Sequence, residues 1–236
     1  ADIALSEKAL NDLAWDEDSG YFGYTMYDKD KNHPYIMKTE SGENWDKGFD
    51  GVYPLISGSV SGERRQRLID HIKNPKEMWS NAGVSAVDMS ASYYFEDGFW
   101  MSHQWFVWKT MLDNGDGDFA FEIANRALEM WKDETDFTYN TYECFGIQTK
   151  RGGWFHNFGG LSAPICIWAD AYYRPGTVTT GFDVWTDYQK TTADSAEISF
   201  KYYGKNDKYT IIVTLDDSND YSVKLDGRDI DFNSRT

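Results

Sequence analysis

Apolar residues recur at helical spacing in several segments of the first 175 residues. Residues 6–15 begin with Ser6, a residue type favoured at helix starts, and carry two leucines on one face, so they predict a short amphipathic helix. Residues 62–72 predict a second helix whose leucine and isoleucines face inward. The segment NPKEMW comes next, and its Pro75 suits the first position of another helix.

Three later segments give stronger helical patterns. Residues 98–112 are apolar around most of a helix circumference, so we expect a buried helix there. Residues 116–134 place apolar side chains, beginning with Phe119, on a single stripe. Residues 161–173 carry Pro164 close to a predicted helix start. The loops between these helices are long and rich in glycine and aromatic residues, and loops of that kind commonly carry the function of a domain.

Strand patterns occur mainly near the end of the chain. The early stretch WDEDSGYFGYTMYDKDKN predicts a hairpin or loop, and after Pro175 the segments AEISFKYYG, KYTIIVTLDD and YSVKLDGRDIDF alternate at period two. Helices followed by strands indicate two segregated parts and not a βαβ repeat. We therefore predict a helical part over residues 1–175 and an antiparallel β tail over residues 176–236.

Composition narrows the function classes. The 236 residues are 41% hydrophobic, enough to bury a core, and the formal net charge of -16 argues against nucleic acid and anionic membranes as partners. No apolar run reaches the length of a membrane span. Cys144 and Cys166 are the only cysteines, and two do not make a disulfide framework in a chain of this size, so free thiols are favoured.

Aromatic residues make up 17% of the chain and include 10 tryptophans. Aromatic rings stack on the C–H faces of sugars, although a tryptophan-rich helical core would give the same composition. The stretch YNTYECFGIQTKRGGWFHNFGG favours sugar binding over a tryptophan-rich core, because it places a single acid, Glu143, among aromatic residues and glycines. A solvated acid needs no aromatic neighbours and a core needs no acid, whereas a sugar-binding pocket needs both.

The order of four motifs is similar to a known family. WDEDSGYFGYTMYD is followed by VYPLISGSVSGERRQRLIDHI, then by GFWMSHQW, and then by TYECFGIQTKRGGWFHNFGGLSAP. This series resembles the C-terminal half of the (α/α)6-barrel glycosidases of glycoside hydrolase family 63. That family includes processing α-glucosidase I, and its clan includes trehalases and mannosylglycerate hydrolases. The resemblance covers roughly residues 6–175, and its specificity lies in the ordered set of motifs, since each motif alone is weak.

The resemblance implies a fold and an activity. The fold would be mainly α, a partial (α/α)6 toroid of about half a barrel, followed by a small antiparallel β domain. The activity would be inverting hydrolysis of α-glycosidic, and within that class α-glucosidic, bonds in oligosaccharides, with Glu143 as the general base. Aromatic surroundings would raise the pKa of such a base by desolvation. Without the resemblance, a glutamate that holds loop amides would be the simpler interpretation.

The resemblance also implies that a part of the catalytic site lies outside this sequence. The family's general acid is an aspartate in a W-D-x-G segment N-terminal to all the motifs found here. The N-terminal remainder of the barrel, or a second chain, would then be a partner. The segment NWDKGFDG imitates the acid motif with Asp46 and Asp50, and we interpret it as a coincidence or a substrate loop. Met101 and Ser102 replace the arginine and glycine of the family's W-R-G segment, so sugar contacts there would differ.

Six further residue positions are candidates for sugar binding. The aromatic side chains could form a sugar platform, and the histidine could hydrogen-bond hydroxyl groups; about half of the aromatic side chains are expected only to pack between helices. These candidate substrate-binding residues are Trp100, His103, Trp105, Trp154, Phe155 and Phe158.

No cofactor is required by the resemblance, and no zinc-type cysteine and histidine cluster occurs. Asp28, Asp30 and Asn32 have the spacing that opens an EF-hand calcium loop, and hard oxygen ligands suit Ca²⁺. His33 at the sixth place and Thr39 at the twelfth exclude a complete EF-hand, so only a calcium site of another shape stays open.

Two alternatives to the enzyme remain. The chain could be a carbohydrate-binding or catalytically silent fragment that uses the same aromatic loops and needs an upstream segment. It could also be a structural helical domain whose core is completed by a partner chain, because half a barrel would expose an apolar flank.

Overall fold

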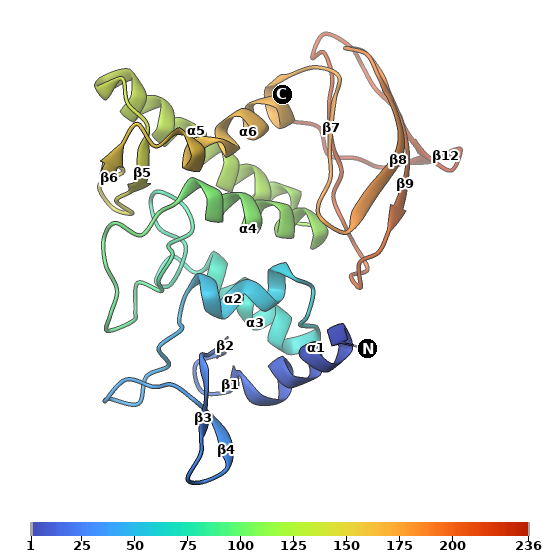
Figure 1. Cartoon of the computed structure of the whole chain (residues 1–236). Helices are drawn as coiled ribbons and strands as arrows, with labels where there is room; N and C mark the ends of the chain where they lie inside the picture. The colour runs from blue at the N-terminus through green and yellow to red at the C-terminus, as the bar shows by residue number, and fades with distance from the viewer. Residues whose placement is uncertain (1, 236) are drawn as a thin grey trace.

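The computed structural model describes residues 2–235 (Figure 1). Within this range the helices are α1 Asp2–Leu13, α2 Phe49–Ile56, α3 Gly62–Lys73, α4 Met101–Asp113, α5 Gly117–Thr138, the 3-10 helix η1 Gly159–Ser162 and α6 Pro164–Tyr173. The strands are β1 Trp15–Asp16, β2 Tyr21–Phe22, β3 Thr25–Asp28, β4 His33–Ile36, β5 Tyr142–Phe145 and β6 Gly152–His156. The tail adds β7 Thr177–Thr179, β8 Val184–Thr191, β9 Ala196–Tyr202, β10 Ile212–Thr214, β11 Val223–Leu225 and β12 Arg228–Ile230.

Two of the predicted helices form with the expected faces inward. In α3 the buried residues are Leu68, Ile69 and Ile72, one apolar stripe on an otherwise charged helix. In α5 the predicted stripe that begins at Phe119 is buried. Asp116 caps α5 by accepting a hydrogen bond from the Phe119 backbone N–H at 3.2 Å.

Helix α4 lies at the centre of the core, as its apolar circumference predicts. Val107, Trp108, Met111 and Leu112 are fully buried, and α4 packs against α2, α5 and α6 (Figure 1). The indole N–H of Trp108 donates a hydrogen bond to the Tyr172 hydroxyl on α6 at 2.8 Å, so the only polar group of this core side chain has a partner.

The expectation of a mainly α fold is wrong. The described chain is 35% helical and 24% strand, with six small antiparallel sheets of two strands each, so the fold is not a helical half-toroid. The physical reason is that the glycine- and aromatic-rich loops form hairpins: β1–β2, β3–β4 and β5–β6 all lie among the helices. A hairpin satisfies the backbone groups of such a loop internally, which an extended connection cannot do once it is buried.

Two further predictions about helices differ from the structure. The segment NPKEMW forms turns and no helix, because the backbone N–H groups of Glu77 and Trp79 both return to the Asn74 carbonyl. The predicted helix at 6–15 is instead α1, which has no buried residue and leaves Leu13 exposed. Conversely, α2 forms around Pro54, and the burial of Phe49, Val52 and Leu55 favours it despite that proline.

The β tail packs against the helical part through a buried acid. The Asp113 carboxylate at the end of α4 accepts hydrogen bonds from the backbone N–H groups of Phe182 and Asp183 at 2.8 and 3.0 Å. Strand β10 also contacts α6, and Ile212 packs against the core. The boundary between residues 175 and 176 stays a prediction.

Cys144 is buried and Cys166 exposed, and both are free thiols. Among the helices described, none combines the length and the apolar character needed to cross a membrane.

Candidate active site

Glu143 lies on the β5–β6 hairpin, which is tied to the start of α4. Phe99 and Phe145 exchange two backbone hydrogen bonds of 3.1 and 2.8 Å, and their rings meet edge to face at 6.2 Å. These two backbone hydrogen bonds place β5 beside Phe99, the residue that precedes Trp100. Segments more than forty residues apart are thereby joined at the point where the sequence predicts a sugar site.

The hairpin is irregular opposite Glu143. Tyr142 pairs with His156 and Cys144 with Gly153, so β6 carries one residue more than β5 between these pairs, a β-bulge. Trp154 stands in this bulge with φ 59°, in the left-handed region, which is an uncommon and costly conformation for an aromatic residue. A bulge re-aims a side chain, and strained residues of this kind gather at functional sites.

Trp154, Trp100 and His103 form a group that we call the aromatic wall. The Trp154 and Trp100 rings meet edge to face with centroids 5.6 Å apart, and the Trp100 ring is 5.7 Å from the His103 imidazole. Asp97 accepts a hydrogen bond from the Trp154 indole N–H at 3.2 Å, which fixes the ring in its unusual position. Trp154 remains 57% exposed, so most of its ring is available to a ligand.

Two carboxylates lie near Cys144 of the hairpin. Glu143 is half-buried, and its charge acts together with that of Asp97 on the buried thiol of Cys144. Burial first, and then these two negative charges, raise the pKa of Cys144 to about 12, so the thiol stays protonated. Asp97 is not among the residues predicted from the sequence, and the only local signal for it is its place directly before the Gly98-to-Trp105 motif.

A second acidic group lies at the other end of the wall. Asp46 is buried, and desolvation together with the charge of Asp50 raises the pKa of Asp46 to about 8. Asp50 is exposed and accepts a hydrogen bond from the Tyr24 hydroxyl. The His103 imidazole packs against the Phe49 ring in a tilted arrangement with centroids 4.7 Å apart, and burial lowers the pKa of His103 even though the Asp50 charge opposes the shift. Near neutral pH, Asp46 is therefore a protonated acid and His103 a neutral imidazole.

The remaining sequence-predicted residues lie in two other places. Trp105 is half-buried and packs edge-on against Phe106 and Phe182, on the side of α4 that faces the tail. Phe155 and Phe158 are exposed on the hairpin and just beyond it. The structure thus brings Trp100, His103 and Trp154 together beside the hairpin that carries Glu143 and places Trp105 with the tail.

The proposed calcium ligands lie in the exposed β3–β4 hairpin. The Asp28 carboxylate accepts backbone hydrogen bonds from Asp30 and Lys31 at 3.0 and 3.1 Å, and these bonds lower the pKa of Asp28. Asn32 takes a left-handed conformation and accepts a hydrogen bond from the Tyr27 hydroxyl. These contacts are those of a tight turn with an aspartate at its first position.

No protein-family model matches this sequence, and no curated protein matches it. Solved structures do match. An uncharacterised conserved protein from Thermus thermophilus has 20% identity and a TM-score of 0.55, over 71% of this chain and 38% of that one. The glycoside hydrolase family 63 mannosylglycerate hydrolase of the same organism, in complex with glucose, has 20% identity and a TM-score of 0.54, over 70% and 36%. Neutral trehalase from Saccharomyces cerevisiae has 16% identity and a TM-score of 0.52, over 71% and 29%.

At these identities the likeness concerns the fold alone. The chain spans less than two fifths of the length of each of these proteins. One of the three is named as a glycoside hydrolase and another as a trehalase, so the chain shares part of its fold with these two enzymes.

Proposed function

We propose that this chain is part of a glycosidase that hydrolyses α-glycosidic bonds, in particular α-glucosidic bonds, in oligosaccharides with inversion of configuration. Glu143 is the general base, and the aromatic wall binds the sugar. The observation that carries this proposal is the β-bulge at Trp154, because it holds an exposed aromatic ring at a strained angle opposite a half-buried carboxylate. The partial fold likeness to glycoside hydrolases supports it.

The chemistry requires two carboxyl groups on opposite faces of the sugar. In an inverting glycosidase they stand roughly 6.5–9.5 Å apart, which leaves room for a water molecule. Glu143 removes a proton from that water as its oxygen bonds to the anomeric carbon. The acid donates its proton to the glycosidic oxygen as the bond to the leaving sugar breaks. A neutral His103 can hydrogen-bond a sugar hydroxyl without adding a positive charge that would disfavour the oxocarbenium-like transition state.

Two sources can supply the acid. The first is an aspartate of an upstream segment, which would come from the remainder of the same protein or from a second chain. The second is Asp46, because a carboxyl whose pKa is about 8 is protonated at neutral pH and can donate. The Asp50 charge acts on both Asp46 and the His103 imidazole, so Asp46 lies on the side of the wall that carries His103.

Hydrolysis of an α-linked glucosyl disaccharide tests the proposal. We expect the isolated chain to bind the sugar with little turnover, and turnover to appear when the upstream segment is supplied in cis or as a separate chain. Glu143→Gln should then lower kcat by roughly 10²–10⁴ while the sugar still binds. Activity that survives Glu143→Gln would contradict the assignment of the base.

Asn substitutions identify the acid. If the isolated chain turns over and Asp46→Asn abolishes that turnover, Asp46 is the donor and the upstream acid is unnecessary. If Asp46→Asn leaves the activity of the completed protein unchanged, the donor is upstream. Asp133→Asn, on the exposed face of α5, is the matched control.

A catalytically silent, carbohydrate-binding chain is the second candidate. The exposure of Trp154 and Phe155 favours it, because stacking on a sugar needs the rings and no acid. Binding that persists with no turnover in the completed protein would favour this candidate.

A further inference from the structure

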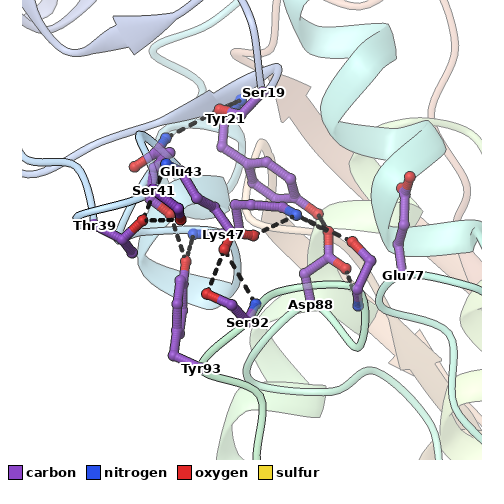
Figure 2. Close-up of polar contacts among 12 residues, drawn as sticks. Ser19, Tyr21, Thr39, Ser41, Glu43, Lys47, Glu77, Asp88, Ser92 and Tyr93 are labelled. Atoms are coloured by element: carbon purple, nitrogen blue, oxygen red, sulfur yellow. Dashed lines mark hydrogen bonds and ion pairs between the residues drawn. The ribbon is translucent and has the colours of Figure 1, made fainter.

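A separate polar cavity of about 310 Å³ lies among the β1–β2 hairpin, the loop before α2, the end of α3 and the segment between α3 and α4, on elements other than those that carry Glu143. Its lining includes five carboxylates, from Asp16, Asp18, Glu43, Glu77 and Asp88, against the ammonium groups of two lysines. In Figure 2, Tyr21 and Lys47 both reach Asp88, and Glu77 stands beside them on a separate segment. The excess of negative charge favours a cation as its occupant.

Three potential metal ligands meet in this cavity. One ligand atom each from His71, Glu77 and Asp88 lie within 4.8 Å of one another. The His71 Nδ1 is 2.6 Å from a Glu77 carboxylate oxygen. The other ring nitrogen, Nε2, is buried under Gly20 and has no hydrogen-bond partner within residues 2–235, so the imidazole meets polar groups through Nδ1 alone.

The surrounding contacts hold these ligands in place. The Tyr21 ring stacks on His71 with centroids 4.1 Å apart, and its hydroxyl donates to Asp88 Oδ2 at 3.0 Å. Burial and the Asp88 charge raise the Tyr21 pKa far above its usual value, so the phenol remains a donor. The other Asp88 oxygen accepts the Ser90 backbone N–H at 2.7 Å. Metal sites commonly have outer contacts of this kind, which orient the ligands.

The nearby lysines do not fill the site. Lys47 donates to Glu43 at 3.1 Å and to the Ser90 hydroxyl at 3.0 Å, and it stands 3.8 Å from Asp88 Oδ2. Lys38 is paired with Asp16 at 3.0 Å. Within the described range, Glu77 therefore has only the His71 imidazole as a partner that can carry positive charge.

We propose that His71, Glu77 and Asp88 bind a divalent first-row transition-metal ion, with Zn²⁺ as the reference ion. One imidazole nitrogen with two carboxylates suits Zn²⁺ or Mn²⁺, whereas Ca²⁺ and Mg²⁺ prefer sites made only of oxygen. A bound ion would join the end of α3, the turn that follows it and the loop before α4. This proposal is independent of the glycosidase assignment.

Isothermal titration of the metal-free full chain with ZnCl₂ tests the site. We expect one equivalent to bind, and His71→Gln and Glu77→Gln each to weaken binding at least about tenfold. Matched controls are His33→Gln on the exposed β3–β4 hairpin and Glu63→Gln on the exposed start of α3, both of which should bind as the wild type does.

Circular dichroism of the metal-free variants shows whether each is folded. His71→Gln loses the ring that stacks on Tyr21, and if this variant unfolds, Glu77→Gln still tests the site. Absence of one-equivalent binding in the wild type would overturn the proposal. So would binding that is unchanged in both site variants, or binding that is lost equally in His33→Gln. Tighter binding of CaCl₂ than of ZnCl₂ would overturn the assignment to a transition metal.

Discussion

Replacing the buried Asp46 by asparagine should make the stability of the chain less dependent on pH. The Asp46 pKa rises from 3.8 to about 8, first because burial penalises its charged form and then because Asp50 lies nearby. The folded chain therefore binds more protons than the unfolded chain between about pH 4 and pH 8. Since unfolding releases these protons, wild-type stability falls as pH rises through that window.

The magnitude follows from the size of the shift. Each pH unit inside the window lowers the wild-type free energy of unfolding by about 1.4 kcal/mol relative to a chain without this group. The full shift would lower the wild-type free energy of unfolding by on the order of 5 kcal/mol at pH 8. This is the upper limit, reached when the structure does not open to water around the ionised carboxylate. Asparagine has nearly the same shape, can accept the hydrogen bond from the Gly51 N–H, and cannot ionise.

Urea unfolding of the wild type and of Asp46→Asn at pH 5, 6, 7 and 8 measures this difference. We expect Asp46→Asn to gain about 1.4 kcal/mol on the wild type with each pH unit between pH 5 and pH 7. Other titrating groups are common to both proteins and cancel in the difference. Asp133→Asn on the exposed face of α5 should show no such slope. A constant difference between Asp46→Asn and wild type from pH 5 to pH 8 would refute the raised pKa.

Two further substitutions test the hairpin and the tail. Trp154→Gly removes the left-handed strain, worth ~1–3 kcal/mol, and also the ring contact, worth ~0.5–1.5 kcal/mol, so the net change in unfolding stability should stay below ~2.5 kcal/mol. Calorimetry should show roughly tenfold weaker sugar binding, because ~60 Å² of ring at ~25 cal/mol/Å² is lost. Trp185→Ala, an exposed tail tryptophan, should bind sugar normally. Asp113→Ala leaves the N–H groups of Phe182 and Asp183 without their acceptor, so urea unfolding should show a free energy of unfolding lower by ~2–4 kcal/mol. Proteases should also cut the tail faster, and an unchanged digestion rate would contradict this anchoring role.

The parts of the fold that could be predicted from the sequence are those whose partners are local. The buried stripe of α3 and the cap of α5 at Asp116 follow from spacing within one helix. The β11–β12 hairpin likewise follows from Asp226 and Gly227 between two alternating segments, and both residues take the left-handed conformation that a two-residue turn requires.

The parts that could not be predicted depend on distant contacts. The bulge at Trp154 exists because β5 is fixed to Phe99 by two backbone bonds and because the Asp97 carboxylate holds the indole N–H. Neither contact leaves a periodic signal in residues 142–156. The same holds for α2, where the burial of its apolar side chains outweighs the proline. Glu143 could be selected from the sequence because its aromatic neighbours are adjacent in the chain, whereas Asp97 could not.

Helix α4 connects the candidate site to the tail and separates them in space. Trp100 precedes the helix and Asp113 ends it, and at about 1.5 Å of rise per residue the two ends stand roughly 20 Å apart. Figure 1 shows the β5–β6 hairpin near one end of α4 and the tail strands near the other. A single sugar ring on Trp100 therefore cannot also touch the residues that Asp113 holds. Trp105 contacts Phe182 of the tail, so its role in sugar binding would be to support the helix that positions Trp100 and His103.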